Sequence, residues 1–140
     1  MSDELVMIVR LLLAGALGAL IGVQREKAGK AAGVRTLALI SLGSALFTVL
    51  SIFAFDTADP ARLAANIVTG IGFLGAGTII LRREEGIVEG LTTAATIWVC
   101  DAVGVAAGAG LYLIAVAAAV IVLVVLLLPH VYPDRGSTKK

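Results

Sequence analysis

The sequence contains one cysteine, Cys100, one histidine, His130, and few aromatic residues (5%). A single cysteine excludes an internal disulfide, a zinc cluster built on cysteines and a Cys-x-x-Cys redox pair. Charge is also scarce, because Asp, Glu, Lys and Arg make up 15% of the chain, against about 25% in soluble domains. Neither a Ser-His-Asp set nor a carboxylate pair at active-site spacing is visible. We therefore expect no enzyme, and we expect no nucleic-acid partner.

Apolar residues are abundant instead, at 59% of the chain with a mean hydropathy of +1.03. A helix that crosses a bilayer needs about 20 mainly apolar residues. The sequence predicts an all-α, polytopic membrane protein embedded in a lipid bilayer. Its domain, residues 1–128, is a bundle of five transmembrane helices over 5–23, 36–55, 63–81, 91–107 and 111–128. Residues 129–140 form a short polar tail.

The positions of the basic residues predict the orientation in the membrane. Nine fall in the first connection, the third connection and the tail: Arg25, Lys27, Lys30, Arg35, Arg82, Arg83, Arg135, Lys139 and Lys140. The opposite side has Arg62, and Arg10 lies within the first helix. Because cytoplasmic loops of membrane proteins carry the excess of Lys and Arg, we expect the N-terminus outside and the C-terminus in the cytoplasm.

The stretch from Gly70 to Ile79, GIGFLGAGTI, begins with the G-x-G-x-x-G pattern of dinucleotide-binding loops. That pattern needs a preceding strand and a turn, whereas here it lies within a spanning segment, so we reject nucleotide binding. Two interpretations stay open. The small residues let helices one, three and four pack as a tight centre, or an irregular backbone lines an ion or water path. The residues concerned are Asn66, Thr69, Gly70, Gly72, Gly75, Gly77 and Thr78.

Asp101 is the strongest single functional signal. A carboxylate within a membrane span is energetically unfavourable, so it is expected to face the bundle interior and to contact a polar or charged partner. We expect an intramembrane charge pair between Arg10 and Asp101. The alternatives are that Arg10 extends to the outer surface and that Asp101 is a protonated or structurally paired acid. We also expect Trp98 to pack in the core, because it lies deep within the fourth span.

A second candidate site is the cytoplasmic mouth of the bundle, where polar residues gather at the helix ends. Arg–carboxylate pairs that tie the first and third connections together are one use, a hard-cation site of carboxylates is another, and a docking surface for a membrane complex is a third. The residues are Arg25, Glu26, Arg35, Thr36, Arg82, Glu84, Glu89, Thr92 and Thr93. No metal ligand set can be named.

Four stretches together resemble the MgtC/SapB family of bacterial inner-membrane proteins. They are Leu20–Glu26 (LIGVQRE), Gly33–Thr36 (GVRT), Gly70–Ile79 and Gly90–Trp98 (GLTTAATIW). The resemblance implies a multi-pass protein of the bacterial inner (cytoplasmic) membrane with five helices. The chain departs from the family pattern at Gln24, where a glutamate is usual, and at Asp101. It also departs at Leu37, where a histidine often stands, and we expect no counterpart of the soluble C-terminal domain that many relatives carry.

The resemblance also implies a role in adaptation to low magnesium, ion homeostasis and, in pathogens, virulence. We expect the protein to act on other membrane machinery, such as the proton ATP synthase. The alternative is a channel or transporter for Mg²⁺ or another cation or proton, through a cavity lined by helices one, three and four. No cofactor is predicted. The alternative is that the protein binds Mg²⁺ or another cation. A homo-oligomer is expected, because small-residue faces such as Gly104 and Gly108 look unused.

Overall fold

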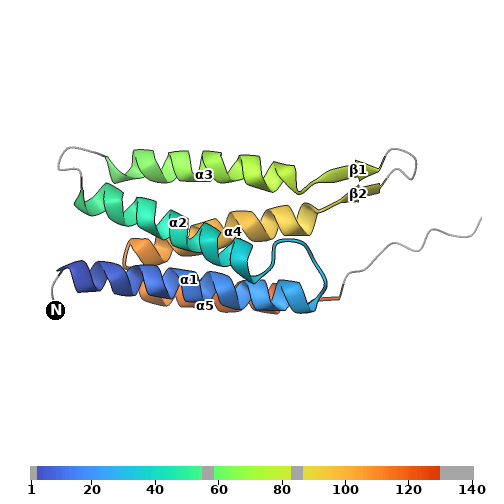
Figure 1. Cartoon of the computed structure of the whole chain (residues 1–140), viewed down its shortest axis with the longest axis horizontal. Coiled ribbons are helices and arrows are strands. Elements are labelled where there is room, and N and C mark those ends of the chain that lie inside the picture. The colour runs from blue at the N-terminus through green and yellow to red at the C-terminus, as the bar shows by residue number, and fades with distance from the viewer. Residues whose placement is uncertain (1–2, 55–58, 83–86, 130–140) are drawn as a thin grey trace, which may run out of the picture.

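The computed structural model describes residues 3–54, 59–82 and 87–129. Its helices are α1 (Asp3–Lys27), α2 (Val34–Phe53), α3 (Pro60–Gly77), α4 (Leu91–Gly108) and α5 (Tyr112–Leu126), with short strands β1 (Ile80–Arg82) and β2 (Ile87–Glu89) (Figure 1). The prediction of an all-α bundle with five helices is confirmed. By length and composition α1, α2 and α4 can each cross a membrane, while α3 and α5 are shorter apolar helices. The five-span topology and the orientation stay predictions.

The helices lie side by side along the long axis of the molecule (Figure 1). At one end, called here the hairpin end, lie the α1–α2 connection and the β1–β2 hairpin. At the other, the N-terminal end, lie the start of α1 and the α4–α5 turn. The hairpin end is therefore the end that the positive-inside rule predicts to be cytoplasmic.

Local sequence explains where α1 and α3 begin and end. Acidic residues occupy the first turn of α1 and basic residues its last turn, which suits the dipole of the helix. Asp59 caps α3, because its side chain accepts a hydrogen bond of 2.9 Å from the Ala61 amide. Pro60 follows at the first helical position, where its missing amide hydrogen is not needed.

The tight centre of the bundle consists of α1, α2 and α4, which pack against one another. A Cβ atom added at Gly18 of α1 would lie 2.4 Å from the Leu37 carbonyl oxygen of α2. One added at Gly104 of α4 would lie 2.2 Å from the Ser41 carbonyl oxygen. Only glycine permits such close approach of two helix backbones, so the small-residue packing predicted for helices one and four is confirmed.

Two expectations about the glycines are corrected by this arrangement. Helix α3 is not part of the centre, because α2 takes that place and α3 packs along α2 and α4. Gly104 and Gly108 do not form a free face for another copy, because both are buried against α2. The physical reason is that α2 offers small polar side chains, such as Ser41 and Ser44, against which helix backbones can approach closely.

Helix α3 is continuous from Pro60 to Gly77, so the irregular backbone considered for the glycine run is absent between Gly70 and Gly77. A Cβ atom at Gly70, Gly72 or Gly77 would meet nothing within 4 Å. At Gly75 it would make an ordinary contact of 3.7 Å with the Ala94 carbonyl oxygen of α4. Most of the glycine run is therefore open at the surface of the bundle rather than pressed into its centre.

The chain leaves α3 earlier than predicted and forms a hairpin. The predicted third helix extends to Leu81, whereas α3 ends at Gly77 and β1 pairs antiparallel with β2, with Ile80 opposite Glu89. Gly90 connects β2 to α4 with a φ of +89°, and a Cβ atom there would lie 1.9 Å from the Thr78 carbonyl oxygen. A glycine is needed at this position for both reasons.

The outer surface of the bundle is largely apolar, as a lipid-facing surface requires. Helix α5 buries only Ala115 and Ala119, so most of its apolar side chains face outward. The expectation that Trp98 packs in the core is wrong, because its side chain is 56% exposed on α4. A large apolar ring can face hydrocarbon without penalty, so depth along a span does not predict burial within the bundle.

Candidate functional site

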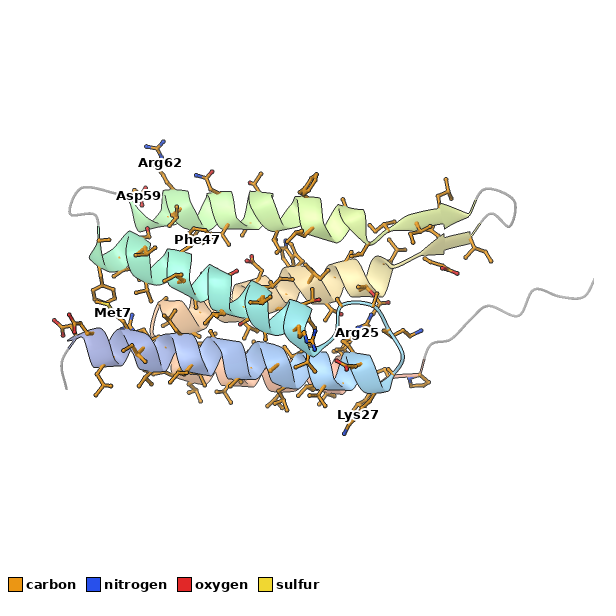
Figure 2. The ribbon with its side chains drawn as sticks, in the orientation of Figure 1. Met7, Arg25, Lys27, Phe47, Asp59 and Arg62 are labelled. Carbon is orange, nitrogen blue, oxygen red and sulfur yellow. The ribbon has the colours of Figure 1, made fainter. Side chains whose placement is uncertain are left out.

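Arg25 is the buried charge at the hairpin end. Its side chain is 4% exposed, although it lies in the last turn of α1, beside the α1–α2 connection (Figure 2). Its Nη2 donates a hydrogen bond to the Thr93 hydroxyl in the first turn of α4, and its buried Nε has no hydrogen-bond partner among the described residues. The guanidinium thus joins α1 to α4 through a neutral oxygen rather than through a carboxylate.

Glu26 and Gln24 flank Arg25 and hold the neighbouring segments. The Glu26 carboxylate accepts a hydrogen bond of 3.1 Å from the Val34 amide, and so occupies the start of α2, where Gly33 offers no side-chain cap. The Gln24 amide donates to the Leu126 carbonyl oxygen at the end of α5, at 3.3 Å. Consecutive residues of α1 therefore contact α5, α4 and α2, and this end of the bundle is shaped by the sequence Gln-Arg-Glu.

The other residues predicted for the cytoplasmic mouth are placed less tightly. Arg35, Thr36, Glu89 and Thr92 are exposed. The side chain of Arg82 and the whole of Glu84 lie outside the described residues. Among the described side chains, Arg25 at the end of α1 contacts Thr93 at the start of α4. Arg–carboxylate pairs between the first and third connections stay a prediction.

Asp101 lies in the middle of α4 with its side chain 2% exposed. Its Oδ1 is in hydrogen-bond contact with the hydroxyl of Ser44 on α2. The same hydroxyl lies 2.9 Å from the Ile40 carbonyl oxygen. The next residue, Cys100, directs its thiol to the Leu37 carbonyl oxygen at 3.4 Å. The predicted interior position of Asp101 is confirmed, and its partner comes from α2.

Arg10 does not form the predicted pair with Asp101. Its Nη1 donates to the Gly108 carbonyl oxygen at 2.9 Å, and its Nε donates to the Tyr112 hydroxyl at 3.4 Å. Its guanidinium also lies 5.2 Å from the centre of the Phe53 ring. Gly108 is seven residues beyond Asp101, or about 10 Å along a helix that rises 1.5 Å per residue. Arg10 thus binds the C-terminal end of α4, where a helix favours a cation.

A cavity of about 480 Å³ lies between α2 and α3. Asn66 and Gly70 of α3 line one wall, and Ser44 and Phe47 of α2 line the other (Figure 2 labels Phe47). The cation-path interpretation requires Asp101, Asn66 and the glycine run to line one cavity, but only Asn66 and Gly70 of these residues line this one. This cavity lies between helices two and three, however, whereas the predicted cavity is lined by helices one, three and four.

The threonines of the glycine segment bond back to their own helix. The Thr69 hydroxyl donates to the Ala65 carbonyl oxygen at 3.0 Å, and the Thr78 hydroxyl donates to the Gly75 carbonyl oxygen at 2.8 Å. Such bonds are the common use of threonine in a membrane helix. Neither hydroxyl is in the cavity lining, so only Asn66 contributes a polar side chain from α3.

Within residues 3–54, 59–82 and 87–129, no group of three or more His, Cys, Asp or Glu side chains is placed to hold a metal ion. Glu84, Glu85 and His130 fall outside those ranges. A cation site at the cytoplasmic mouth therefore stays a prediction.

Sequence reasoning missed the role of α2, although a signal was present. Ser41, Ser44, Thr48 and Ser51 recur at spacings of three and four, and all four are buried. This spacing places them on one face of a helix. A polar stripe in an otherwise apolar and uncharged span indicates the side that faces the interior of a bundle, and so it identifies the partner of Asp101.

Comparison with known proteins decides the family. The MgtC family model matches residues 11–132. The chain belongs to the MgtC family. MgtC of Brucella abortus is 52% identical over 101 residues, which cover 71% of this chain and 42% of that protein. The protein of Escherichia coli K12 named "Putative magnesium transporter YhiD" is 46% identical over 113 residues, which cover 75% of this chain and 52% of that protein.

A protein of Haemophilus influenzae with no assigned function is 44% identical over 117 residues, covering 77% of this chain and 49% of that protein. The chain thus spans about half the length of the curated relatives it matches. No solved structure matches it. The four stretches that resemble the family lie within residues 11–132. Three of them meet at the hairpin end, where Arg25 contacts Thr93 and Glu26 contacts the Val34 amide.

Proposed function

We propose that this MgtC-family chain is a non-enzymatic protein of the bacterial inner membrane that supports growth at low magnesium by regulating other membrane machinery. The name of the Escherichia coli relative, which contains the words magnesium transporter, supports a link to magnesium. The proton ATP synthase is the partner proposed here. In pathogens the same role serves virulence, and the chain acts as a homo-oligomer.

The observation that carries this choice is the closed centre of the bundle. Between α1, α2 and α4 the helix backbones touch at Gly18 and Gly104, where an added Cβ atom would lie within 2.4 Å of a carbonyl oxygen. A hydrated cation cannot pass between backbones at such separations. The described core therefore favours a protein that acts through its surfaces.

Reconstitution tests the proposal. Purified protein is inserted into sealed vesicles loaded with a magnesium-sensitive dye, and a second set also contains purified ATP synthase driven by a proton gradient. We expect Mg²⁺ entry equal to that of empty vesicles, and slower ATP synthesis when the protein is present. Mg²⁺ entry above the empty-vesicle rate would reject the regulatory role.

A cation or proton transporter is the second candidate, favoured by one observation. Asn66 and Ser44 line the cavity between α2 and α3, and Ser44 contacts Asp101. The chain offers a matched pair of variants, because Gly70 lines this cavity and Gly72 does not, while both have open space around an added side chain. A transporter through the cavity would lose flux in Gly70→Leu and keep it in Gly72→Leu.

A further inference from the structure

The hydroxyl of Ser44 is placed between two oxygens. One is the Ile40 carbonyl oxygen, at 2.9 Å, and the other is Oδ1 of Asp101. A serine hydroxyl has one proton to donate, together with lone pairs that accept. It can therefore donate to one of these oxygens, and the contact with the other requires a proton from elsewhere.

Only a protonated Asp101 places a proton in both contacts. The carboxyl group then donates to the Ser44 hydroxyl oxygen, and the Ser44 hydroxyl donates to the Ile40 carbonyl oxygen. With an ionised Asp101, the carboxylate and the Ile40 carbonyl oxygen compete for the single Ser44 proton, so that at least one of the two contacts is weakened. The geometry thus favours the neutral acid.

The charged groups of the helices around Asp101 support the same protonation state. Helix α4 has no other charged residue, and α5 has none. On α1, Arg10 and Arg25 bind at Gly108 and Thr93, seven and eight residues from Asp101 along α4. The basic residues of α2 and α3 are Arg35 and Arg62, both exposed in the first turns of their helices. The neighbouring thiol of Cys100 donates to Leu37.

A buried carboxylate without a cation is strongly disfavoured inside a membrane protein, and the group takes up a proton instead. We propose that Asp101 is a proton-binding residue, neutral in the folded protein, that donates its proton to Ser44. Ser44 also lines the cavity between α2 and α3, so this proton exchanges with the surroundings through Ser44 and the cavity. The proposal does not depend on whether the protein regulates or transports.

Infrared difference spectroscopy on protein in lipid vesicles tests the proposal at neutral pH. We expect a carbonyl stretch of a protonated carboxylic acid that shifts in D₂O and is missing in Asp101→Asn. The matched control is Asp59→Asn, because Asp59 is an exposed cap of α3, and this variant keeps the band. The side-chain amide introduced by Asp101→Asn can still donate to Ser44, so the fold of that variant is expected to be retained.

A second variant tests the contact itself without altering the acid. Ser44→Ala removes the acceptor, so the carbonyl stretch of Asp101 is expected to move to the frequency of a less strongly hydrogen-bonded acid. Absence of the band in the wild-type protein would show an ionised Asp101 and overturn the proposal. A band that stays in place in Ser44→Ala would overturn the donation to Ser44.

Discussion

A methyl group added at Gly104 would lie 2.2 Å from the Ser41 carbonyl oxygen, whereas one added at Gly72 would meet nothing within 4 Å. Both glycines are in regular helix, so both lose the same intrinsic helix propensity relative to alanine. What differs is the space around them. Helix packing therefore requires a glycine at position 104 but not at position 72.

We predict that Gly104→Ala lowers the stability of the bundle by about 1–3 kcal/mol, the usual penalty of overpacking. Gly72→Ala, the matched control, is expected to be neutral or to stabilise by up to about 1 kcal/mol, because alanine favours helix. Reversible unfolding in mixed micelles measures both. Equal effects at the two positions would mean that α4 does not approach α2 as closely as described.

Arg25 is a buried cation that donates to the neutral Thr93 hydroxyl, and within the described part of the chain its Nε has no hydrogen-bond partner. Replacing a buried ionic group by an apolar one of similar size is often neutral or stabilising, by about 1–4 kcal/mol. We predict that Arg25→Met leaves stability unchanged or raises it, while growth at low magnesium is lost in a complementation assay. Lys27→Met, at an exposed position in the same turn, is expected to change neither. A strong loss of stability in Arg25→Met would assign Arg25 a purely structural role.

At the scale of the helices, Arg10 connects four elements at the N-terminal end. It lies on α1, its guanidinium is over the Phe53 ring of α2, and it donates to Gly108 of α4 and Tyr112 of α5. The carbonyl end of α4 carries the negative end of the helix dipole. The cation is therefore bound where α4 lacks internal donors for its last carbonyl groups.

We predict that Arg10→Gln lowers stability by about 1–2 kcal/mol, because a partly buried cation at a helix C-terminus contributes up to about 2 kcal/mol. The control is Arg62→Gln, since Arg62 is exposed at the same end of the bundle (Figure 2). Hydrogen exchange of the α4–α5 turn gives a local readout and is expected to quicken only in Arg10→Gln. Unchanged exchange there would contradict the role assigned to Arg10.

The helices themselves were largely predictable, because the apolar runs are long and are separated by charge, by proline or, between α4 and α5, by the glycines Gly108 and Gly110. Helix α3 is the exception at its C-terminal end, since Ile79–Leu81 continue the apolar run but form part of a hairpin. Which helices touch was harder to predict. Small residues correctly indicated that α1 and α4 pack tightly, but they also suggested α3 in place of α2 and a free face at Gly104 and Gly108.

The sequence predicted which residues belong to the candidate site better than it predicted which of them contact one another. The interior position of Asp101 follows from the penalty for charge in lipid. The partner of Asp101 could not be predicted in the same way. Opposite charge suggested Arg10, whereas in the structure the carboxyl group contacts the hydroxyl of Ser44. Similarly, Arg25 was recognised as part of the mouth, but its burial depends on how α2 and α4 close over the end of α1.

At the scale of the whole molecule, the two ends of the bundle differ in charge. The hairpin end has Arg25, Lys27, Lys30 and Arg35, whereas the N-terminal end has Asp3 and Glu4 in the first turn of α1 and Asp59 as the N-cap of α3. Because basic loops are retained in the cytoplasm, this asymmetry predicts how the bundle lies in the membrane.

We predict that, in a Cys100→Ala background, the Arg62→Cys variant reacts with a membrane-impermeant thiol reagent in intact spheroplasts. The Lys27→Cys variant is expected to react only after the membrane is opened. Inside-out vesicles give the converse pattern. Labelling of Lys27→Cys in intact spheroplasts would reverse the orientation and move the Arg25 site to the outer face.

The placement of the two arginines of α1 has a consequence for the order in which the protein is built. Their hydrogen-bond acceptors, Thr93, Gly108 and Tyr112, all lie in the last third of the described chain. Helix α1 therefore leaves the ribosome carrying two cations whose final partners are synthesised later, in α4 and α5. Until α4 and the start of α5 have been inserted, α1 must keep both groups at the edges of the bilayer. Insertion of α4 and the start of α5, rather than insertion of α1 itself, is then the step that fixes the position of α1.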